Sequence, residues 1–264
     1  MSKPTPTWLL ALGKKGLPPQ VSAGGGVYRL SRVFKHDFFA ATALYEGPPG
    51  KVLVKVNRQA SMFGLPLRWI GRVLAHRECA ALERLAGIPG VPRLIERFDR
   101  TGFVREFVDG EPMAKGRRVP DDFHAKLRSL VAEIHRRDMA YVDLEKCENV
   151  LVGADGQPYL FDFQIAWYVA PYWGGNLWPL TLFRRFFQHG DLYHLRKLQR
   201  RTRPDQFSAE ELAASYAKPW YVRLHLIIVR PFTLLRRWIL NKIDPRRKRG
   251  ERGRIDDTET MGVR

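Results

Sequence analysis

The sequence predicts an α+β protein, and three segments carry this prediction. Residues 51–56 (KVLVKV) alternate between polar and apolar side chains, the pattern of a half-buried strand. Residues 67–86 have apolar side chains at helical spacing and end before Gly87, a residue type that commonly terminates helices. Residues 149–152 (NVLV), a mainly apolar strand-like segment, precede a turn at Asp155 and Gly156, which predicts a hairpin. With 264 residues the chain can form one unit with an adequate core.

Asp143, Asn149 and Asp162 stand in this order around the predicted hairpin. Phosphoryl transfer from a nucleotide needs a carboxylate to orient the attacking hydroxyl, and an amide oxygen and a second carboxylate to hold magnesium. The set resembles the catalytic and magnesium loops of the protein kinase-like superfamily, whose motifs read H-R-D-L-x-x-x-N and D-F-G. Upstream, residues 134–137 (IHRR) are similar to the end of the helix that precedes the catalytic loop in that family.

The resemblance covers roughly residues 28–198. It implies a two-lobed protein kinase-like fold, with a small β-rich N-lobe and a larger helical C-lobe. It also implies that Asp143 orients the acceptor hydroxyl and that Asn149 and Asp162 bind Mg²⁺. ATP and Mg²⁺ are therefore the expected cofactors.

The sequence departs from the family motifs at several positions. Tyr141 and Val142 stand where the family has His and Arg, and one extra residue separates Asp143 from Asn149. Gln164 replaces the glycine of the D-F-G motif, so the backbone freedom of glycine is absent. Without the arginine, a phosphorylated activation loop has no obvious partner beside the catalytic carboxylate. The chain is thus similar to atypical kinases rather than to ordinary protein kinases.

Lys55 is expected to bind the α- and β-phosphates of ATP, because it resembles the lysine of the V-A-I-K motif. Its expected partner is Glu78, which lies within the apolar stripe of the predicted helix. Burial of a lone carboxylate is costly unless a cation meets it. The sequence therefore predicts an ion pair between Lys55 and Glu78.

The loop that covers the phosphates should lie at residues 33–39, and it contains no glycine. Lys35 and His36 are candidate side-chain donors in place of backbone amides. The glycines at positions 24–26 lie too far upstream and are assigned to a flexible lead-in.

Residues 103–110 resemble the strand and hinge that contact adenine in the family. Glu106 and Val108 are the candidate adenine contacts, mainly through their backbone. Arg105 occupies a back-wall position that is usually apolar, so the geometry of the adenine contact stays open.

The formal net charge is +18, and residues 184–254 hold 19 lysines and arginines against six acids. Such a region attracts a polyanion, either nucleic acid or an anionic membrane surface. No nucleic-acid-binding motif accompanies it, so nucleic acid is not the expected partner. The two cysteines form no metal-spaced pair and no secretory signal is present, which favours a reducing cytoplasm.

Two apolar segments favour the membrane as the partner. Residues 165–183 contain no charged side chain, although two prolines and a Gly-Gly pair make a continuous helix unfavourable. Their aromatic side chains suit the headgroup region of a membrane, and they include Trp167, Tyr168, Tyr172 and Trp173, with Trp178 close behind. Residues 220–243 mix apolar and basic side chains, as interfacial helices do. Packing within the C-lobe is the alternative for both segments.

Residues 191–198 (DLYHLRKL) resemble a helix of small bacterial kinases that act on lipopolysaccharide core sugars, in which the acid braces the catalytic loop. The expected function is ATP-dependent phosphorylation of a hydroxyl on a lipid-linked acceptor, at the inner face of a membrane. A protein Ser/Thr acceptor is one alternative, supported by Lys146 near Asp143. A pseudokinase that binds without turnover is another, motivated by the glycine-free loop.

The expected organisation has four parts. Residues 1–20 form a loosely ordered N-terminus and residues 21–108 the N-lobe. Residues 109–244 form the C-lobe, and residues 245–264 form a basic tail.

Overall fold

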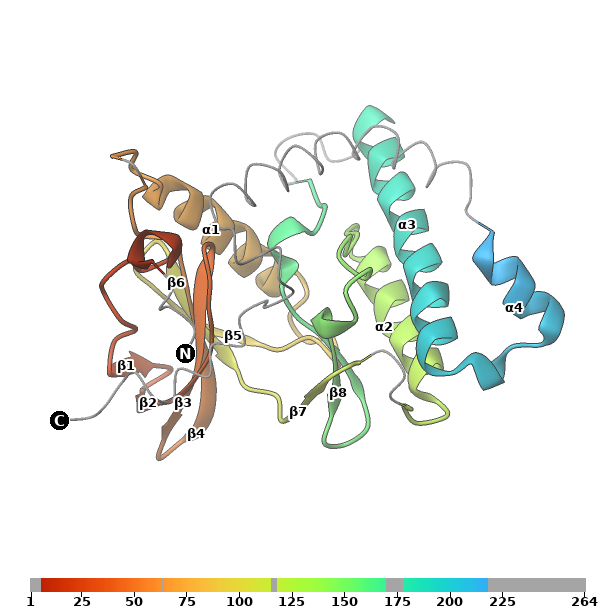
Figure 1. The fold of residues 1–264 in the computed structure, drawn as a ribbon, viewed down its shortest axis with the longest axis horizontal. Helices are drawn as coiled ribbons and strands as arrows, with labels where there is room; N and C mark the ends of the chain where they lie inside the picture. The colour runs from red at the N-terminus through yellow and green to blue at the C-terminus, as the bar shows by residue number, and fades with distance from the viewer. Residues whose placement is uncertain (1–5, 63, 115–117, 170–177, 218–264) are drawn as a thin grey trace. The chain divides into compact units, whose positions relative to one another are not determined.

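A six-stranded antiparallel sheet forms the N-terminal part of the chain (Figure 1). Its strand order is β1-β2-β3-β4-β6-β5, so only the last two strands depart from sequence order. The strands are β1 (Gln20–Ala23), β2 (Gly26–His36), β3 (Ala40–Gly47), β4 (Gly50–Asn57), β5 (Leu94–Phe98) and β6 (Gly102–Glu106). The computed structural model describes residues 6–62, 64–114, 118–169 and 178–217.

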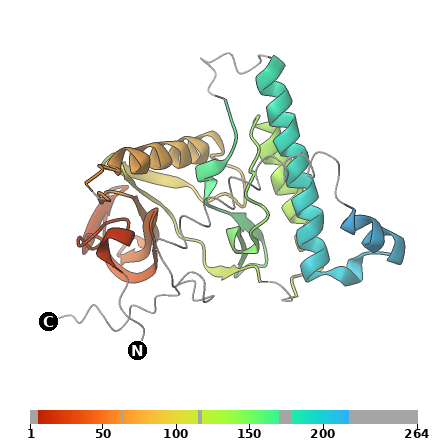
Figure 2. The ribbon, with the colours of Figure 1, turned by 45° about the horizontal axis from the view of Figure 1, so that its top comes forward.

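Helix α1 (Arg68–Arg84) lies against strands β4, β5 and β6 of this sheet (Figure 2). It buries one side, including Ala75, Glu78 and Leu82. The helix ends three residues before Gly87, which adopts φ +83°. The predicted helix and the strand before it are thus confirmed, and α1 also contacts the 3-10 helix Phe163–Ile165 from the second half of the chain.

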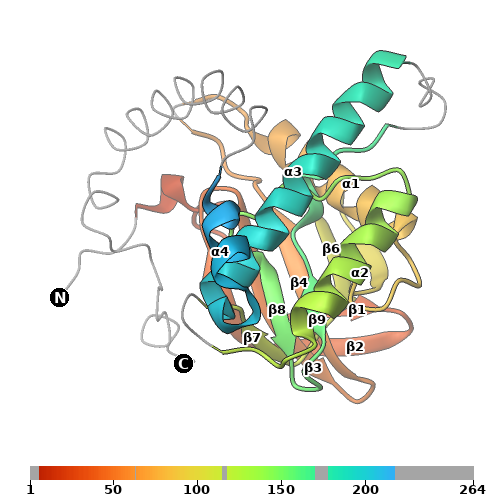
Figure 3. The same ribbon diagram turned by 90° about the vertical axis from the view of Figure 1, so that its right-hand side faces the viewer.

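The C-terminal part combines a small sheet with two long helices. Strands β7 (Gly110–Pro112), β8 (Val150–Gly153) and β9 (Pro158–Leu160) form a three-stranded antiparallel sheet. Helices α2 (Phe123–Arg136) and α3 (Trp178–Thr202) lie side by side (Figure 3). The predicted hairpin of residues 149–160 is therefore present as β8 and β9. An N-terminal β-sheet region followed by a helical region is the α+β arrangement that the sequence predicts.

The start of the chain corrects one expectation. Residues 6–20 were expected to be loosely ordered, but Ala11 and Leu12 are buried beside the sheet. The N–H of Ala11 donates to the carbonyl of Asp37, and the carbonyl of Ala11 accepts from Gln59 and Ala60. These backbone hydrogen bonds hold the segment in place because they join it to two separate strand ends.

The glycines at positions 24–26 are also placed differently from the expectation of a flexible lead-in. Gly24 and Gly25 form the two-residue turn between β1 and β2, with Ala23 paired to Gly26. Their φ angles are +57° and +77°, which glycine adopts at little cost and which two-residue hairpin turns require. The glycines thus build an additional hairpin at the edge of the sheet.

Two compact units divide the chain, Met1–Phe207 and Ser208–Arg264. In the second unit the structure describes helix α4 (Ala209–Tyr216), which begins with a capping box between Ser208 and Glu211. The predicted interfacial segment 220–243 and the predicted basic tail 245–264 lie outside the described residues. Within the described ranges, no helix combines the length and the apolar character needed to cross a membrane.

Candidate active site

Lys55 stands at the centre of a buried ionic cluster. Its Nζ lies 2.7 Å from Glu78 Oε2 on α1 and 3.0 Å from Asp162 Oδ1, which follows β9. The predicted pair of Lys55 and Glu78 is therefore present. Burial disfavours the ammonium, but the carboxylates of Glu78 and Asp162 outweigh this effect and raise the pKa of Lys55. Lys55 is a cation held between two carboxylates from distant parts of the chain.

Asp162 adopts a left-handed backbone conformation, with φ +65°. Such a conformation is uncommon for residues other than glycine and is maintained by the surrounding structure. Burial alone would raise the pKa of its carboxyl group. The charge and hydrogen bond of Lys55 outweigh this effect, so the pKa of Asp162 lies below its ordinary value. Asp162 is therefore ionised and can bind a cation.

Gln164 fits the position where the family has glycine. It lies within the 3-10 helix Phe163–Ile165 and has no positive φ, so glycine is not required there. Its Nε2 donates to Asn57 Oδ1 at 2.8 Å, and its carbonyl accepts from Arg77 Nε at 3.2 Å. These bonds join the segment after Asp162 to both β4 and α1.

Asp143 lies next to Asn149 and Lys146 in the loop before β8. Its Oδ2 accepts from Lys146 Nζ at 2.6 Å and from Asn149 Nδ2 at 2.7 Å. The extra residue of this loop is Leu144 or Glu145, and the contacts of Asp143 are present despite it. Leu144 is fully buried, and Glu145 pairs with Lys197 at 2.8 Å. The structure thus brings together Asp143, the predicted proton acceptor, and Asn149, one of the two predicted magnesium ligands.

Asp191 of α3 braces the loop that carries Asp143. It is fully buried, and its two oxygens accept the backbone N–H groups of Tyr141 and Val142, each at 2.8 Å. The oxygen that accepts from Tyr141 also lies 3.0 Å from His135 Nε2 of α2. The bracing acid that the sequence predicted is therefore present.

Tyr141 occupies the place of the family's histidine and connects the two halves of the site. It is fully buried, and its hydroxyl donates to the carbonyl of Phe161 and contacts that of Asn149 at 3.5 Å. Its ring meets the ring of Phe163 edge-on, with centroids 5.2 Å apart. Tyr141 therefore positions the backbone beside both expected magnesium ligands. The sequence reading treated it only as a departure from the motif.

Asn149 and Asp162 offer the ligand types that Mg²⁺ prefers. Among the described residues, Asn149 Oδ1 and Asp162 Oδ2 accept no hydrogen bond, so one oxygen on each side chain is available. Mg²⁺ commonly takes only one or two protein oxygens and completes its octahedron with water and nucleotide phosphates. No group of three or more His, Cys, Asp or Glu side chains in the described part of the chain is arranged to hold a metal. The pair therefore fits a nucleotide-bound Mg²⁺ rather than an all-protein site.

The loop between β2 and β3 uses its own side chains in place of glycine. Asp37 Oδ1 accepts from the N–H groups of Phe39 and Ala40, at 2.8 and 3.0 Å. Lys35 Nζ lies 2.8 Å from Asp37 Oδ2 and its side chain is 63% exposed. His36 Nε2 accepts from the N–H of Leu12 at 3.2 Å, so this nitrogen of the ring is engaged within the protein, and the role of His36 at a phosphate stays a prediction. Lys35 therefore has a largely exposed side chain, while His36 is half-buried.

A buried arginine that the sequence reading missed holds the same loop. Arg58 is fully buried, and its guanidinium donates to the carbonyls of Phe38 and Trp8, at 2.8 and 3.0 Å. The guanidinium also lies over the Phe38 ring, 3.8 Å from its centroid. No sequence motif marks this residue, because its partners lie 20 and 50 positions away.

Arg105, which the sequence analysis expected at the back wall of the adenine site, is buried. Its Nη1 donates to the carbonyl of Glu106 at 3.0 Å, and burial lowers its pKa while Glu78 and Asp162 favour its charge. The N–H of Glu106 donates to the carbonyl of Arg93, so both backbone groups of Glu106 are engaged within the protein. The carbonyl of Glu106 has a second lone pair, so the predicted adenine contact at Glu106 stays a prediction. Val108 is half-buried, and its backbone N–H and carbonyl form no hydrogen bond with the described residues.

The similarity of this chain to the known proteins named below covers part of its length. No family model matches the chain. The probable SapB synthase of Streptomyces coelicolor is 30% identical over 117 residues, which cover 36% of this chain and 12% of that protein. Two structures of the Rio2 kinase from Chaetomium thermophilum, one of them an ADP/Mg²⁺-phosphoaspartate complex, each share 18% identity and cover 75% of this chain. Their TM-scores are 0.49 and 0.48, and 65% and 66% of those chains are covered.

The arrangement of this chain identifies its fold. A lysine on an antiparallel sheet pairs with a glutamate on the adjoining helix, and a carboxylate from the helical half completes the cluster. A braced loop presents a second carboxylate beside an amide. These features together are those of a protein kinase-like fold.

Proposed function

We propose that this protein transfers the γ-phosphoryl group of ATP to a hydroxyl group, with Mg²⁺ as cofactor. The observation that carries the proposal is the contact of Lys55 Nζ with both Glu78 and Asp162, since it gathers residues separated by up to 107 positions. A buried cation between two carboxylates is costly unless the cluster is well paired, and perturbed groups of this kind gather at functional sites. The Asp162 side chain is 32% exposed, so the cluster is accessible at this residue.

Each residue has a defined part in this mechanism. Lys55 would bind the α- and β-phosphates while Glu78 positions it, and Asn149 and Asp162 would hold Mg²⁺. Asp162 Oδ1 contacts Lys55, so Oδ2 is the oxygen of this side chain that would be free to bind the metal. The Mg²⁺ would neutralise charge that develops on the phosphates.

The transfer step exchanges one P–O bond for another. The acceptor oxygen forms a bond to the γ-phosphorus, the bond to the β–γ bridging oxygen breaks, and ADP leaves. Asp143 orients the hydroxyl and takes its proton, while Lys146, 2.6 Å from Asp143 Oδ2, offers a positive charge to the transferred group. Asp143 Oδ1 accepts no hydrogen bond from the described residues, so this oxygen is available to the hydroxyl.

The proposed acceptor is a lipid-linked molecule, such as a lipopolysaccharide core sugar, at the inner face of a membrane. Support comes from the start of α3, where Trp178, Leu182 and Phe183 are 74%, 50% and 56% exposed. Trp178, Leu182 and the exposed Arg185 follow the i, i+4, i+7 spacing of one helix face. Apolar and basic side chains together favour an anionic membrane surface.

Other parts of the expected membrane segment have a different role. Trp167 forms a backbone bridge with Ala140, and its ring packs 5.3 Å from that of Phe187. Tyr168 donates to the carbonyl of Arg77. Trp167 and Tyr168 therefore contact other parts of the protein, as in the alternative of packing within the C-lobe. Tyr172 and Trp173 lie outside the described residues.

A protein Ser/Thr acceptor is the second candidate. The contact of Lys146 with Asp143 supports it as well as it supports the first candidate, since a cation beside the catalytic carboxylate serves any alcohol acceptor equally. A pseudokinase is the third, because Asp37 already takes the N–H groups of Phe39 and Ala40, which a nucleotide would otherwise use.

One experiment separates the three candidates. Pure protein is incubated with γ-labelled ATP, Mg²⁺ and membrane extract, and the label is followed into lipid and protein fractions. Label in the lipid fraction, lost in Asp143→Asn, supports the proposal. Label only in protein favours the second candidate, and ATP binding without any label above that of Asp143→Asn favours the third.

A further inference from the structure

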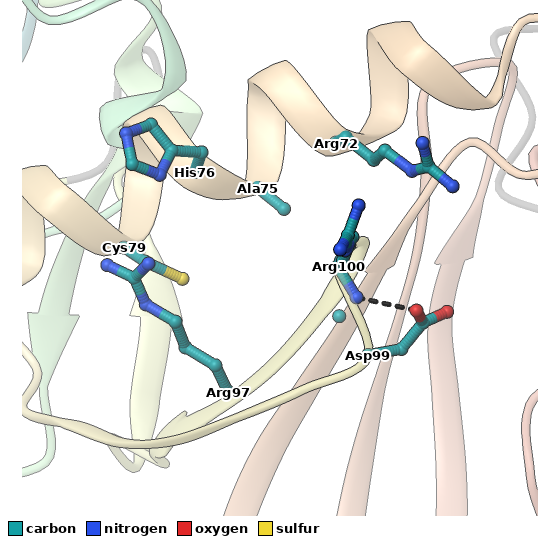
Figure 4. Close-up of a pocket in the computed structure, with 8 residues that line it drawn as sticks. Arg72, Ala75, His76, Cys79, Arg97, Asp99 and Arg100 are labelled. Carbon is teal, nitrogen blue, oxygen red and sulfur yellow. Dashed lines mark hydrogen bonds between the residues drawn. The ribbon is translucent and has the colours of Figure 1, made fainter.

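A cavity of about 330 Å³ lies between α1 and the turn from β5 to β6, and the proposed reaction does not use it (Figure 4). Its lining comes from two elements that also frame the active site. These residues are Arg72, Ala75, His76 and Cys79 of α1, and Arg97, Asp99, Arg100 and Gly102 of the strands and their turn.

Small side chains leave the space open at the base of the cavity. Ala75 and Cys79 are 4% and 1% exposed and present little bulk toward the strands. Gly102 has no room for a larger residue, because a Cβ there would lie 2.6 Å from the Phe98 ring. The base is therefore small and apolar, while longer polar side chains stand around it.

The charges around the cavity are unbalanced. Three arginines and one carboxylate line it, so the lining has an excess positive charge of two before His76 is counted. Arg97 pairs with Glu83 at 2.8 Å, and Asp99 pairs with Arg68 at 2.8 Å. Within the described part of the chain, the side chains of Arg72 and Arg100 make no ion pair. In Figure 4, Arg100 rises from the turn toward α1, and Arg72 extends from the helix beside it.

We propose that this cavity binds a small, soluble, phosphate-bearing molecule through Arg72 and Arg100. Guanidinium groups match the geometry of phosphate oxygens and bind them through paired hydrogen bonds. Two unpaired guanidinium groups from opposite walls can hold one anion between them, and the apolar base accepts the organic part of the ligand. The cavity volume is within the range of small-molecule sites.

Occupancy of the cavity would act on the active site through α1. Cys79 directly follows Glu78, whose carboxylate holds Lys55. A ligand that joins Arg72 on the helix to Arg100 on the turn ties α1 to the sheet in the position that keeps Glu78 on Lys55. The ligand is therefore an activator, and this part of the inference rests on the proposed function. Such coupling requires that the ligand bind the paired state more tightly.

The test measures binding of pyrophosphate to the full chain by calorimetry in Mg²⁺-free buffer. The variant is Arg72→Ala with Arg100→Ala, and the matched control is Arg29→Ala with Arg196→Ala, which removes the same charge from exposed positions elsewhere. Pyrophosphate affinity should fall at least about tenfold in the variant and change less than about twofold in the control. The same affinity in the variant and in the control would overturn the inference, as would a parent protein that binds no pyrophosphate.

Two further arms complete the test. Vesicles that contain phosphatidic acid are compared with free pyrophosphate, and Arg72- and Arg100-dependent binding to vesicles alone would rule out a soluble ligand. Pyrophosphate should increase the rate of label transfer by the parent protein but not by the Arg72→Ala, Arg100→Ala variant. Absent transfer with intact, arginine-dependent binding would refute the proposed function and leave the cavity as a binding site, so the two failures are distinguishable.

Discussion

Asp191 accepts a hydrogen bond from the backbone N–H of Val142, at 2.8 Å, and holds this residue at φ +73°. A β-branched residue in this region is strained, and the next residue in the chain is Asp143. The fully buried carboxylate of Asp191 thus fixes the backbone from which the proposed catalytic side chain extends.

Replacement of Asp191 should therefore weaken both folding and catalysis. Asp191→Ala leaves the buried N–H of Tyr141 without its partner, at about 1–3 kcal/mol in unfolding free energy, and the part-buried N–H of Val142 without its partner at a smaller cost. Turnover should fall while the Michaelis constant for ATP changes little, and Asp191→Asn should be milder because one acceptor oxygen stays. Denaturant unfolding and steady-state kinetics measure the two effects. The control Asp109→Ala removes an exposed carboxylate and should alter neither.

Asp143→Asn should abolish phosphoryl transfer and leave ATP binding nearly unchanged. The amide cannot take the hydroxyl proton, and loss of a general base commonly costs about 10²–10⁴-fold in rate. The label-transfer rate and the ATP dissociation constant are measured on the same preparation. Asp155→Asn, in the exposed turn between β8 and β9, serves as the control. Turnover of Asp143→Asn within about threefold of the parent would remove Asp143 from this role.

Lys55→Met and Glu78→Gln should each reduce turnover, and the double variant should be little worse than the more impaired single variant. The reason is that both changes break the same contact, the 2.7 Å pair between Nζ and Oε2. Four values of kcat/KM, for the parent, the two single variants and the double variant, complete the cycle. Fully additive losses would show that the two side chains act independently and that another acid positions Lys55.

Trp178→Ala with Phe183→Ala should make binding to anionic vesicles fully reversible by salt. The parent protein should bind anionic but not zwitterionic vesicles and should keep part of that binding at high salt, because burial of apolar surface is not screened by ions. Vesicle sedimentation across a salt series measures this. Trp69→Ala with Val73→Ala removes two other exposed apolar side chains, on α1, and should behave as the parent. Parent protein that ignores anionic vesicles at low salt but binds RNA or DNA tightly would contradict the membrane proposal.

His124 should make the protein less stable as the pH falls from about 6.5 toward about 4. Burial first, and then the charges of Arg203 and Arg128, lower the pKa of His124 to about 4. The unfolded chain has the ordinary histidine pKa of about 6.5, so within this window it binds a proton that the folded protein does not. Stability is complete above the window and declines by at most about 1.4 kcal/mol for each pH unit within it.

His124→Gln should remove this contribution, since glutamine does not titrate and can still meet Thr202 Oγ1, which lies 2.7 Å from His124 Nε2. Denaturant unfolding at several pH values gives the slopes for the parent and the variant. The control His189→Gln changes an exposed histidine and should keep the parental slope. Identical slopes for His124→Gln and the parent would exclude His124 as the source.

Several parts of the site were predictable because they depend on local order along the chain. Asp143, Asn149 and Asp162 lie within about 20 residues of one another around a hairpin whose strand pattern is visible in the sequence. Glu78 was identifiable because a carboxylate within an apolar helix stripe requires a buried cation. Its pairing with Lys55 follows from the same electrostatic reason.

Other parts depended on contacts between distant segments. Two hydrogen bonds could not be predicted from residue spacing, because 24 and 20 positions separate the partners. They are the bond from the N–H of Leu12 to His36 and the bond from Arg58 to the carbonyl of Phe38. The hydrogen bond from the N–H of Glu106 to the carbonyl of Arg93 likewise accompanies the pairing of β5 with β6. Hydrogen-bond partners of this kind are chosen by geometry rather than by residue type.

The sequence by itself thus determined the α+β class, the positions of the main strand and helix elements, and the residue types that meet at the site. Periodic apolar patterns and the cost of an unpaired buried charge are local properties, so they are visible along the chain. Only the tertiary structure decided that the Tyr141 hydroxyl contacts the carbonyls of both Asn149 and Phe161, the residue before Asp162. The same holds for the additional hairpin whose turn is formed by Gly24 and Gly25. The tertiary structure also placed Arg72 and Arg100 on opposite walls of one cavity. Those outcomes depend on which distant surfaces pack together, and packing is a property of the whole fold.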